Sequence, residues 1–489
     1  MKKKISTYVV CALMAAAAVM AMVSCQKKYE MIPPPVINGN NEFDDEEDVK
    51  SVYFVSQFGG GEYDGTSWEN SLDEAGLRDL LTNSTDLGNS TIYVSEGEYL
   101  MSDQPGSGIS VKKDIMAVVG GFSMFSAGTD ISVRNPEKYR TVFSGDVNHN
   151  KIADEGDCYL MGIYSGRILF DGIVFSGGYV DARTAEAGLV NGNQTPSSGI
   201  SLFGTDPSSV VLDMVDCTVS GCDASGLSNS TYAGGAALRI MNGTARLKNV
   251  VLEKNISNNR GGAVRLCNFN SVCYMDGCSV VDNVQPGTWG VGIQASQGHL
   301  CMNNSTLMDN MNGSGAVING NASFLLVNST VILDSSTGTN AGAFRTESQT
   351  GLYTYLINNV IICENGSSPS IYVNRDNPQI KSYGYNVHTG EMVTAGSTML
   401  NQADMQMSVN GVRNGYLWEW DASALGGYAT FDQVYECVSS FNPEYSCPVP
   451  ELGKDFLSWM GEASLGMDAR GEARNSGKLQ PGAYDVNLK

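Results

Sequence analysis

The most specific cluster of potential ligands is the twelve-residue stretch DVNHNKIADEGD at 146–157. It places side-chain oxygens at Asp146, Asn148, Asn150, Asp154 and Asp157. Alternating Asp and Asn residues allow one loop to surround a hard cation with six to eight oxygens. The stretch differs from the EF-hand pattern at its sixth position, where Lys151 replaces glycine. The spacing predicts a calcium ion that fastens the loop; the alternative is a plain acidic loop between strands.

Cysteine chemistry offers a second possibility. Of the 12 cysteines, Cys11 lies in an apolar leader and Cys25 directly follows it, and the others show no paired CxxC spacing typical of zinc. Cys437 and Cys447 stand close together in a loop-like region, and we predict a disulfide between them, which an exported chain permits. Cys217 and Cys278 fit better as small core residues.

The N-terminal residues predict export and a lipid anchor. Three lysines precede the apolar stretch Tyr8 to Val23, which is too short to span a bilayer comfortably. The sequence VSC before QKK resembles a bacterial lipobox with Cys25 as the lipidated residue; an ordinary secretory signal is the alternative. Residues 25–50 carry PPP and EFDDEED, which are typical of a flexible acidic tether. We therefore expect a signal peptide at 1–24, the tether, a folded body at 51–390 and a C-terminal region at 391–489.

Bulk composition favours a β-protein with many turns. Glycine is frequent (56), proline is scarce (14) and charged residues make up 17% of the chain. The formal net charge is −22, and removal of the three leader lysines makes the mature chain more acidic still. This charge argues against nucleic acid and anionic lipid surfaces as partners.

A repeat of about 27 residues dominates the middle of the chain, and a period in this range indicates a solenoid. One phrase recurs as FDGIVFSGG (170–178), VDCTVSGC (215–222), KNVVLEKN (248–255), DGCSVVDN (276–283), NNSTLMDN (303–310), VNSTVILD (327–334) and NNVIICEN (358–365). A second recurs between them as GGAALRI (234–240), GGAVRLC (261–267), GVGIQAS (290–296), SGAVING (314–320), AGAFRTE (341–347) and SPSIYVN (368–374).

Period-two alternation within each phrase predicts β-strands, stacked coil on coil. One inward column is Ile173, Cys217, Val250, Cys278, Ser305, Ser329 and Val360. The next is Phe175, Val219, Leu252, Val280, Leu307, Val331 and Ile362. At the strand exits, Asn255, Asn283, Asn310 and Asn365 predict a ladder of amides bonded between coils, rather than a binding row.

The segment that opens the folded body resembles a known superfamily. SVYFVSQFGGGEYDGTSWENSLDEAGLRDLL followed by STIYVSEGEYL (51–100), GGF (120–122) and YRTVFSGD (139–146) are similar to the first coils of pectin-lyase-like proteins. Within that superfamily the segment resembles surface lipoproteins of Bacteroidota, whose closing D-x-x-G-x-x-R…GAYE pattern is similar to residues 465–485. The resemblance implies a right-handed parallel β-helix with an N-terminal capping helix, near 71–81, and an irregular C-terminal cap.

The resemblance also implies where catalysis would lie. Lyases of this fold use calcium-binding carboxylates beside an arginine or lysine base, so Arg265, Arg345, Asp282 and Asp309 are weak catalytic candidates, with Arg239 close to the arginine column. The alternative is charge on a solvated face that repeats because the coils repeat. Hydrolases of the fold often carry Gly-His-Gly, but His149, His299 and His388 do not, and we expect them at turns or on the surface.

Aromatic rings offer another route to sugar binding, because pyranose rings stack on exposed tyrosine and tryptophan. The candidates are Tyr164, Tyr179, Tyr232, Trp289, Tyr353 and Tyr372, each of which could equally be packing. We expect a monomeric, lipid-anchored surface protein of the outer membrane that binds glycan or host and matrix ligands without catalysis. The alternative is a polysaccharide lyase or glycoside hydrolase acting on an acidic polysaccharide, and a structural spacer is a third possibility.

Overall fold

The computed structural model describes most of the chain after residue 50. The described residues are 51–83, 87–125, 133–181, 196–227, 234–286, 290–312, 316–333, 342–346, 352–363, 371–373, 379–389, 403–407, 409, 411–420, 422–443 and 449–484. Cys25, Asn365 and Cys447 lie outside them.

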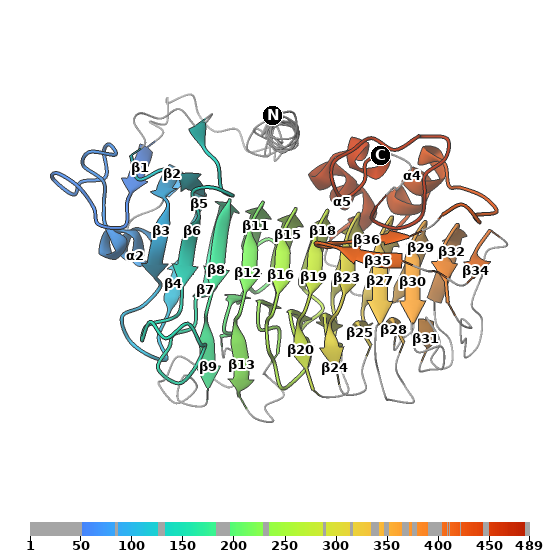
Figure 1. Ribbon diagram of the computed structural model, residues 1–489, viewed down its shortest axis with the longest axis horizontal. Helices are drawn as coiled ribbons and strands as arrows, with labels where there is room; N and C mark the ends of the chain where they lie inside the picture. Colours follow the sequence, from blue (N-terminus) through green and yellow to red (C-terminus); the bar gives the residue numbers. More distant parts are fainter. Residues whose placement is uncertain are drawn as a thin grey trace, which may run out of the picture. The chain divides into compact units, whose positions relative to one another are not determined.

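The chain winds through three parallel sheets, which we call sheets I, II and III (Figure 1). Sheet I contains β1 (Ser51–Val55), β2 (Leu87–Ser95), β5 (Ile115–Phe122), β7 (Met161–Asp171), β11 (Val210–Val215), β15 (Gly243–Lys248), β18 (Ser271–Asp276), β22 (His299–Asn303), β26 (Ser323–Val327), β29 (Tyr353–Ile357) and β32 (Gln379–Gly384). Sheet II contains β3 (Gly97–Leu100), β6 (Thr141–Ser144), β8 (Ile173–Ser176), β12 (Thr218–Ser220), β16 (Val251–Glu253), β19 (Ser279–Val281), β23 (Thr306–Met308), β27 (Thr330–Leu333), β30 (Val360–Cys363), β33 (Val387–His388) and β34 (Met405–Gln406).

Sheet III has the shortest strands. It contains β4 (Ile109–Lys112), the first part of β7, β10 (Ile200–Leu202), β14 (Leu238–Ile240), β17 (Val264–Leu266), β21 (Ile293–Ala295), β25 (Ile318–Gly320), β28 (Phe344–Thr346) and β31 (Ile371–Val373). Two parallel pairs, β9 (Tyr179–Asp181) with β13 (Asp223–Gly226) and β20 (Val284–Gln285) with β24 (Met311–Asn312), lie between sheets II and III along the chain. In the regular coils the chain runs from sheet III to I to II, and each strand pairs with its counterpart one coil on. The fold is therefore the predicted right-handed parallel β-helix.

A single apolar core fills the interior of the coils. Inward side chains of all three sheets join it, as Leu238, Leu247 and Leu252 do within one coil. The predicted N-terminal helix is present as α2 (Glu74–Thr82), which packs against β1 and β4. Asp73 caps it by accepting the N–H of Gly76 at 2.9 Å, and its leucines at 77, 80 and 81 are buried.

Amide side chains connect the coils where sheet II ends. The amide nitrogen of Asn255 donates to Oδ1 of Asn283 at 2.9 Å, and that of Asn283 donates to Oδ1 of Asn310 at 2.9 Å. All three side chains are buried. The predicted ladder is confirmed for these three residues.

The predicted inward columns hold in every coil but one. Val360 pairs with Thr330 and faces outward, whereas Asn359 takes the inward place and accepts the N–H of Ser329 at 3.0 Å. Likewise Ile361 is inward and Ile362 outward. The prediction was wrong by one residue there because β30 is apolar on both faces, and a strand buried on both sides shows no alternation to fix its register.

The described C-terminal residues cover the sides of the later coils. An antiparallel hairpin, β35 (Gly411–Asn414) and β36 (Leu417–Trp420), lies on the outer face of sheet II, where Trp418 and Trp420 pack among Val281 and its neighbours. The helices α4 (Phe431–Ser439), α5 (Leu452–Met460) and η2 (Glu462–Gly466) lie on sheet I beside β18 to β29 (Figure 1). We expected an irregular cap over the end, and these residues instead fold back along the solenoid.

A second amide ladder holds this C-terminal segment. On sheet I, Asn303 donates to Asp276, Asn328 donates to Asn303 and Asn358 donates to Asn328, at 2.7–3.0 Å. The amide of Asn328 also donates to the carbonyl of Leu465, at 3.1 Å. The ladder therefore bonds both to the next coil and to the segment lying over it.

The buried Arg474 gives the closing motif its role. Its guanidinium donates to the carbonyls of Met467, Gln480 and Gly482 at 2.5–2.8 Å and to Oδ1 of Asn304 at 3.3 Å. This arginine therefore ties three turns of the tail to the solenoid. No helix among the described residues is long and apolar enough to cross a membrane.

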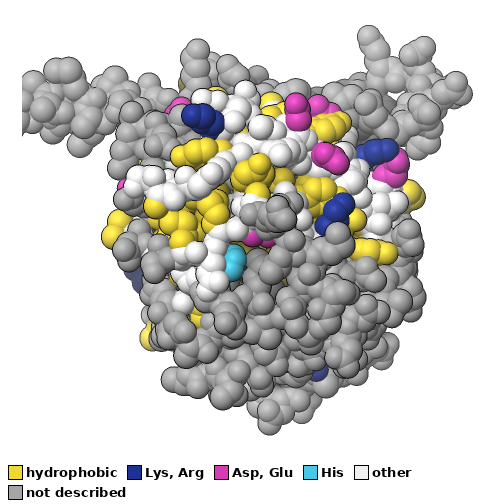
Figure 2. Space-filling view, turned by 90° about the vertical axis from the view of Figure 1, so that its right-hand side faces the viewer, with side chains coloured by type: hydrophobic (Ala, Val, Ile, Leu, Met, Phe, Trp, Pro, Cys, Tyr) yellow, Lys and Arg dark blue, Asp and Glu magenta, His cyan; other side chains and the backbone are white. Residues whose placement is uncertain are grey.

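The surface at the end that carries the last coils is mixed in character. Figure 2 shows hydrophobic side chains over its upper part, with acidic and basic side chains around them. The visible described surface of this end carries no patch of one charge sign.

The Asn ladder predicts a specific stability loss. Replacing Asn283 with alanine removes a buried amide that donates to Asn310 and to the carbonyls of Leu252 and Val281. It also removes the oxygen that accepts the backbone N–H and the side-chain amide of the buried Asn255. We expect a loss of about 2–4 kcal/mol in the free energy of unfolding, measured by urea denaturation. The matched control is Asn258→Ala, an exposed amide, which should change stability by less than about 0.5 kcal/mol. Equal free energies of unfolding for the two variants would contradict a contribution of the Asn ladder to stability.

Candidate ligand-binding row on sheet III

One outward-facing row of polar side chains crosses sheet III. Residues in register on neighbouring strands form it: Ser201, Arg239, Arg265, Gln294, Asn319 and Arg345, followed by Tyr372. The residues on either side of each row position point into the core, as Val264 and Leu266 do around Arg265. Because side chains alternate along a strand, the row lies on the outer surface of the sheet, with members about 4.8 Å apart.

The row is largely buried beneath chain that enters the sheet. Arg239 and Arg265 are 1% and 4% exposed, whereas Arg345 is half-buried. Oε1 of Gln294 accepts the N–H of Gly290 at 2.9 Å, which shows the incoming chain passing over the row. Asn319 is fully buried, and neither polar atom of its amide has a hydrogen-bond partner within the described part of the chain. Such an amide is costly to bury, and cost of this kind is tolerated most often at functional sites.

Arg265 in the middle of the row keeps its positive charge at neutral pH although its pKa is lowered. Burial, together with the neighbouring charges of Arg239 and Arg260, lowers the pKa of Arg265 to about 10. At pH 7 that guanidinium still carries its proton in all but about one molecule in a thousand. Arg265 is therefore suited to binding an anion and poorly suited to abstracting a proton.

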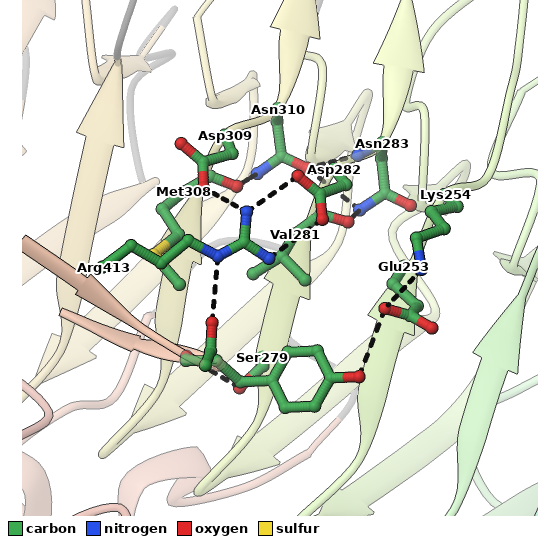
Figure 3. A network of polar contacts seen from close by, with 12 residues as sticks. Glu253, Lys254, Ser279, Val281, Asp282, Asn283, Met308, Asp309, Asn310 and Arg413 are labelled. Atoms are coloured by element: carbon green, nitrogen blue, oxygen red, sulfur yellow. Dashed lines mark hydrogen bonds and ion pairs between the residues drawn. The ribbon is translucent and has the colours of Figure 1, made fainter.

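The carboxylates predicted as partners of these arginines lie elsewhere. Asp282 and Asp309 follow β19 and β23 on sheet II, each in a left-handed turn. Both bind Arg413 of the hairpin: its guanidinium makes two bonds of 2.9 Å to Asp282 and a third to Asp309 (Figure 3). Hydrogen bonds to Asp282 raise the pKa of Arg413.

The predicted acid and base candidates thus fall into two groups. Arg265 and Arg345 share the row, while Asp282 and Asp309 anchor the hairpin on another sheet. Sequence reasoning missed Gln294 and Asn319 as row members. The signal was present, because each is the residue between two inward positions of the second repeated phrase, as Arg265 is.

The acidic loop forms a compact turn between β6 and β7. Oδ1 and Oδ2 of Asp146 accept the N–H groups of Asn150 and Lys151, and the amides of Asn148 and Asn150 donate to Asp154 at 2.9 and 2.6 Å. Burial raises the pKa of Asp157. Among the described residues no three His, Cys, Asp or Glu side chains are already placed to hold a metal ion.

The remaining histidine and cysteine candidates have ordinary surroundings. His149 lies in the acidic loop, as expected, but His299 and His388 are buried in β22 and β33, so the expectation of turn or surface positions was wrong for them. Cys437 is buried on α4. Because Cys447 lies outside the described residues, the disulfide stays a prediction.

The aromatic candidates form no exposed row within the described residues. Tyr164 stacks on Phe203 with ring centroids 4.9 Å apart, and Tyr353 joins the cluster beneath α4. Tyr179 is half-buried on β9. Tyr232 and Trp289 lie outside the described residues, and of Tyr372 only the strand position is described.

Comparisons with known proteins return distant structural neighbours and no family. No family model matches the chain, and no curated protein matches it. Among solved structures, pectate lyase Pel9A is 14% identical, with 68% of this chain and 80% of that chain covered and a TM-score of 0.33. The PL6 family alginate lyase AlyGC is 12% identical, with 80% and 63% covered and a TM-score of 0.28. XylC in complex with xylose is 10% identical, with 82% and 81% covered and a TM-score of 0.25.

The hairpin contact predicts a local effect of Arg413. Replacing Arg413 with glutamine removes the only bonds that Figure 3 draws between the hairpin and the two aspartates. Because the guanidinium is 35% exposed, we expect a loss below about 1 kcal/mol in global stability, with clearly faster protease cleavage within 411–420. Lys254→Gln, which removes an exposed pair with Glu253 on the same face, is the control and should leave cleavage unchanged. Equal cleavage of both variants and the parent chain would refute the anchoring role.

Proposed function

We propose that this chain is a non-catalytic, lipid-anchored surface protein that binds an acidic glycan through the row on sheet III. The observation that carries the proposal is the alignment of three arginines with two amides on one outer face of a regular solenoid. A guanidinium binds carboxylate or sulfate groups through paired, charge-assisted hydrogen bonds. A linear acidic polymer presents such groups at regular intervals, as the stacked coils present their side chains.

Access to the row supports binding at its far end. Arg345 is its only half-buried arginine among the described residues, and it neighbours the unpartnered amide of Asn319. A ligand carboxylate at Arg345 would also give Asn319 a hydrogen-bond partner. We therefore place the first contact with the glycan at these two residues.

Export and anchoring rest on the N-terminal sequence. The leader at 1–24, lipidation of Cys25 and the acidic tether at 25–50 would hold the β-helix at the outer membrane, facing outward. A tether rich in acidic residues keeps a folded body away from an anionic surface, which suits a protein whose partner lies in the surroundings.

An enzyme is the second candidate, and one observation favours it. The lowered pKa of Arg265 brings a guanidinium closer to the range of a general base, as a lyase acting on acidic polysaccharide would need. The described residues place no carboxylate of the predicted set beside Arg265, and the predicted pair is held by Arg413 instead. Binding without cleavage therefore agrees better with the geometry.

The test uses residues 26–489 and a panel of acidic and neutral polysaccharides. Retention of the protein and release of new chain ends are followed together, with calcium and with chelator. We expect retention on acidic polymers, weakened by salt, and no new ends. New chain ends, especially at a rate that rises with pH towards 10, would overturn the non-catalytic assignment in favour of a lyase. Absence of retention on every polymer would refute glycan binding.

Arg345→Gln supplies the residue-level test of the row. Loss of one charge-assisted contact should weaken retention on the acidic polymer at least about tenfold. The control is Arg167→Gln, a partly exposed arginine paired with Asp213 on sheet I, which should bind as the parent does. Equal weakening by both variants would indicate general charge attraction and not the row.

A further inference from the structure

We propose that loop 146–157 binds one calcium ion through the side-chain oxygens of Asp146, Asn148, Asn150, Asp154 and Asp157. This site is separate from the row on sheet III and does not depend on the function proposed for that row.

The strongest observation is the environment of Asp157. Its side chain is 1% exposed, and its Oδ1 atom has no hydrogen-bond partner. Its other oxygen accepts the N–H of Asp154 at 2.9 Å, which turns the carboxylate towards the loop. A buried carboxylate oxygen without a donor carries a large desolvation cost, and a cation is the ligand that removes it.

Among the described residues, the neighbours of Asp157 supply negative charge and no ion-pair partner. Asp146 and Asp154 lie close enough for their charges to act on Asp157. No ion pair between described residues includes any of these three carboxylates. Three acidic groups of one loop thus share a region in which each lacks a basic partner, and a divalent cation would neutralise most of that charge.

The backbone conformation of Lys151 is compatible with an EF-hand loop, although the sequence has no glycine at that sixth position. The sixth position of an EF-hand loop needs glycine because the chain there makes a sharp turn. Lys151 occupies that position and has φ +63°, in the left-handed region that favours glycine. The chain therefore makes the turn despite the side chain of Lys151. Ile152 follows at the seventh position, which in an EF-hand loop contributes a backbone carbonyl.

Ion binding would exchange four hydrogen bonds of the two Asn side chains for oxygen contacts, because each amide oxygen also accepts a backbone N–H of the loop. The amides of Asn148 and Asn150 now donate to Asp154, so their oxygens and the carboxylates do not surround one point. Rotation of both amides would present their oxygens in place of their nitrogens. Together with Asp146, Asp154, Asp157 and one backbone carbonyl, the two rotated amides would give six oxygen ligands. Six is the lower end of the range for calcium, and oxygen is the ligand atom that calcium prefers.

The consequence of binding is a fixed connection in the early coils. The backbone carbonyl of Asp157 accepts the N–H of Gly106, and Cys158 donates its N–H to Gly145. The ion would therefore fasten the loop that leads from β6 to β7 and, through Gly106, the loop that precedes β4.

Isothermal titration calorimetry with calcium chloride, on residues 26–489 freed of metal by chelation, is the first experiment. We expect one binding event, a rise in Tm with calcium and slower protease cleavage within 146–157. Magnesium should bind at least tenfold more weakly, because it demands closer octahedral geometry. No heat and no Tm shift at millimolar calcium would overturn the proposal.

Variants locate the site. Asp157→Asn and the less buried Asp154→Asn should each weaken calcium binding at least tenfold, and agreement between them excludes a folding defect at one position. Asp206→Asn is the matched control, because Asp206 likewise bonds to backbone N–H groups within its own loop, and it should bind calcium as the parent does. Lys151→Gly removes the backbone strain of a non-glycine residue in the left-handed region, and this variant should still bind calcium. Unchanged affinity in both Asp157→Asn and Asp154→Asn would overturn the assignment, even if calcium binds elsewhere.

Discussion

Coil-to-coil hydrogen bonding by buried amides is the constraint on which the rest of the solenoid depends. A side-chain amide has one acceptor oxygen and a donor nitrogen, so a row of them can satisfy itself only at the spacing of neighbouring strands. Asn255, Asn283 and Asn310 do this beside sheet II, and Asn359 and Asn386 do it on another row. Any slip of one coil would leave several buried polar groups unpaired at once, which holds the whole stack in register.

The later coils carry a second requirement, because their outer faces are apolar as well. Strands such as β26 and β30 are buried on both sides, and they remain so because the C-terminal segment folds back over sheets I and II. The ladder that ends at Asn358 and the buried Arg474 give that segment polar partners along its path. The same packing covers the outer faces of sheets I and II in these coils.

The sequence predicted what repeats locally and missed what depends on distant segments. Strands, inward columns and the amide ladder follow from periodicity, and they were found at residues such as Asn283 and Val280. The register of Val360 was lost because the C-terminal cover removes the alternation that reveals it. The pairing of Asp282 with Arg413 spans 131 residues, and no local pattern indicates it. The candidate arginines were recognised, but Gln294 and Asn319 were not, because the search looked for charge and the row continues through amides.

The net charge of the chain is negative, whereas the row on sheet III contains arginines. A chain with a net charge of −22 repels a polyanion at long range, yet Debye screening at physiological salt limits that repulsion to about 8 Å. Within this distance the local groups decide, and on sheet III they are guanidiniums and amides, of which Arg239, Arg265, Gln294 and Asn319 are already buried in the fold. An acidic surface around a cationic row would therefore slow the approach of an acidic glycan but restrict its binding to the row. In the same way, the carboxylates of Asp146, Asp154 and Asp157 would attract calcium, so that the two proposed ligands, which differ in the sign of their charge, would bind at different places on one acidic chain.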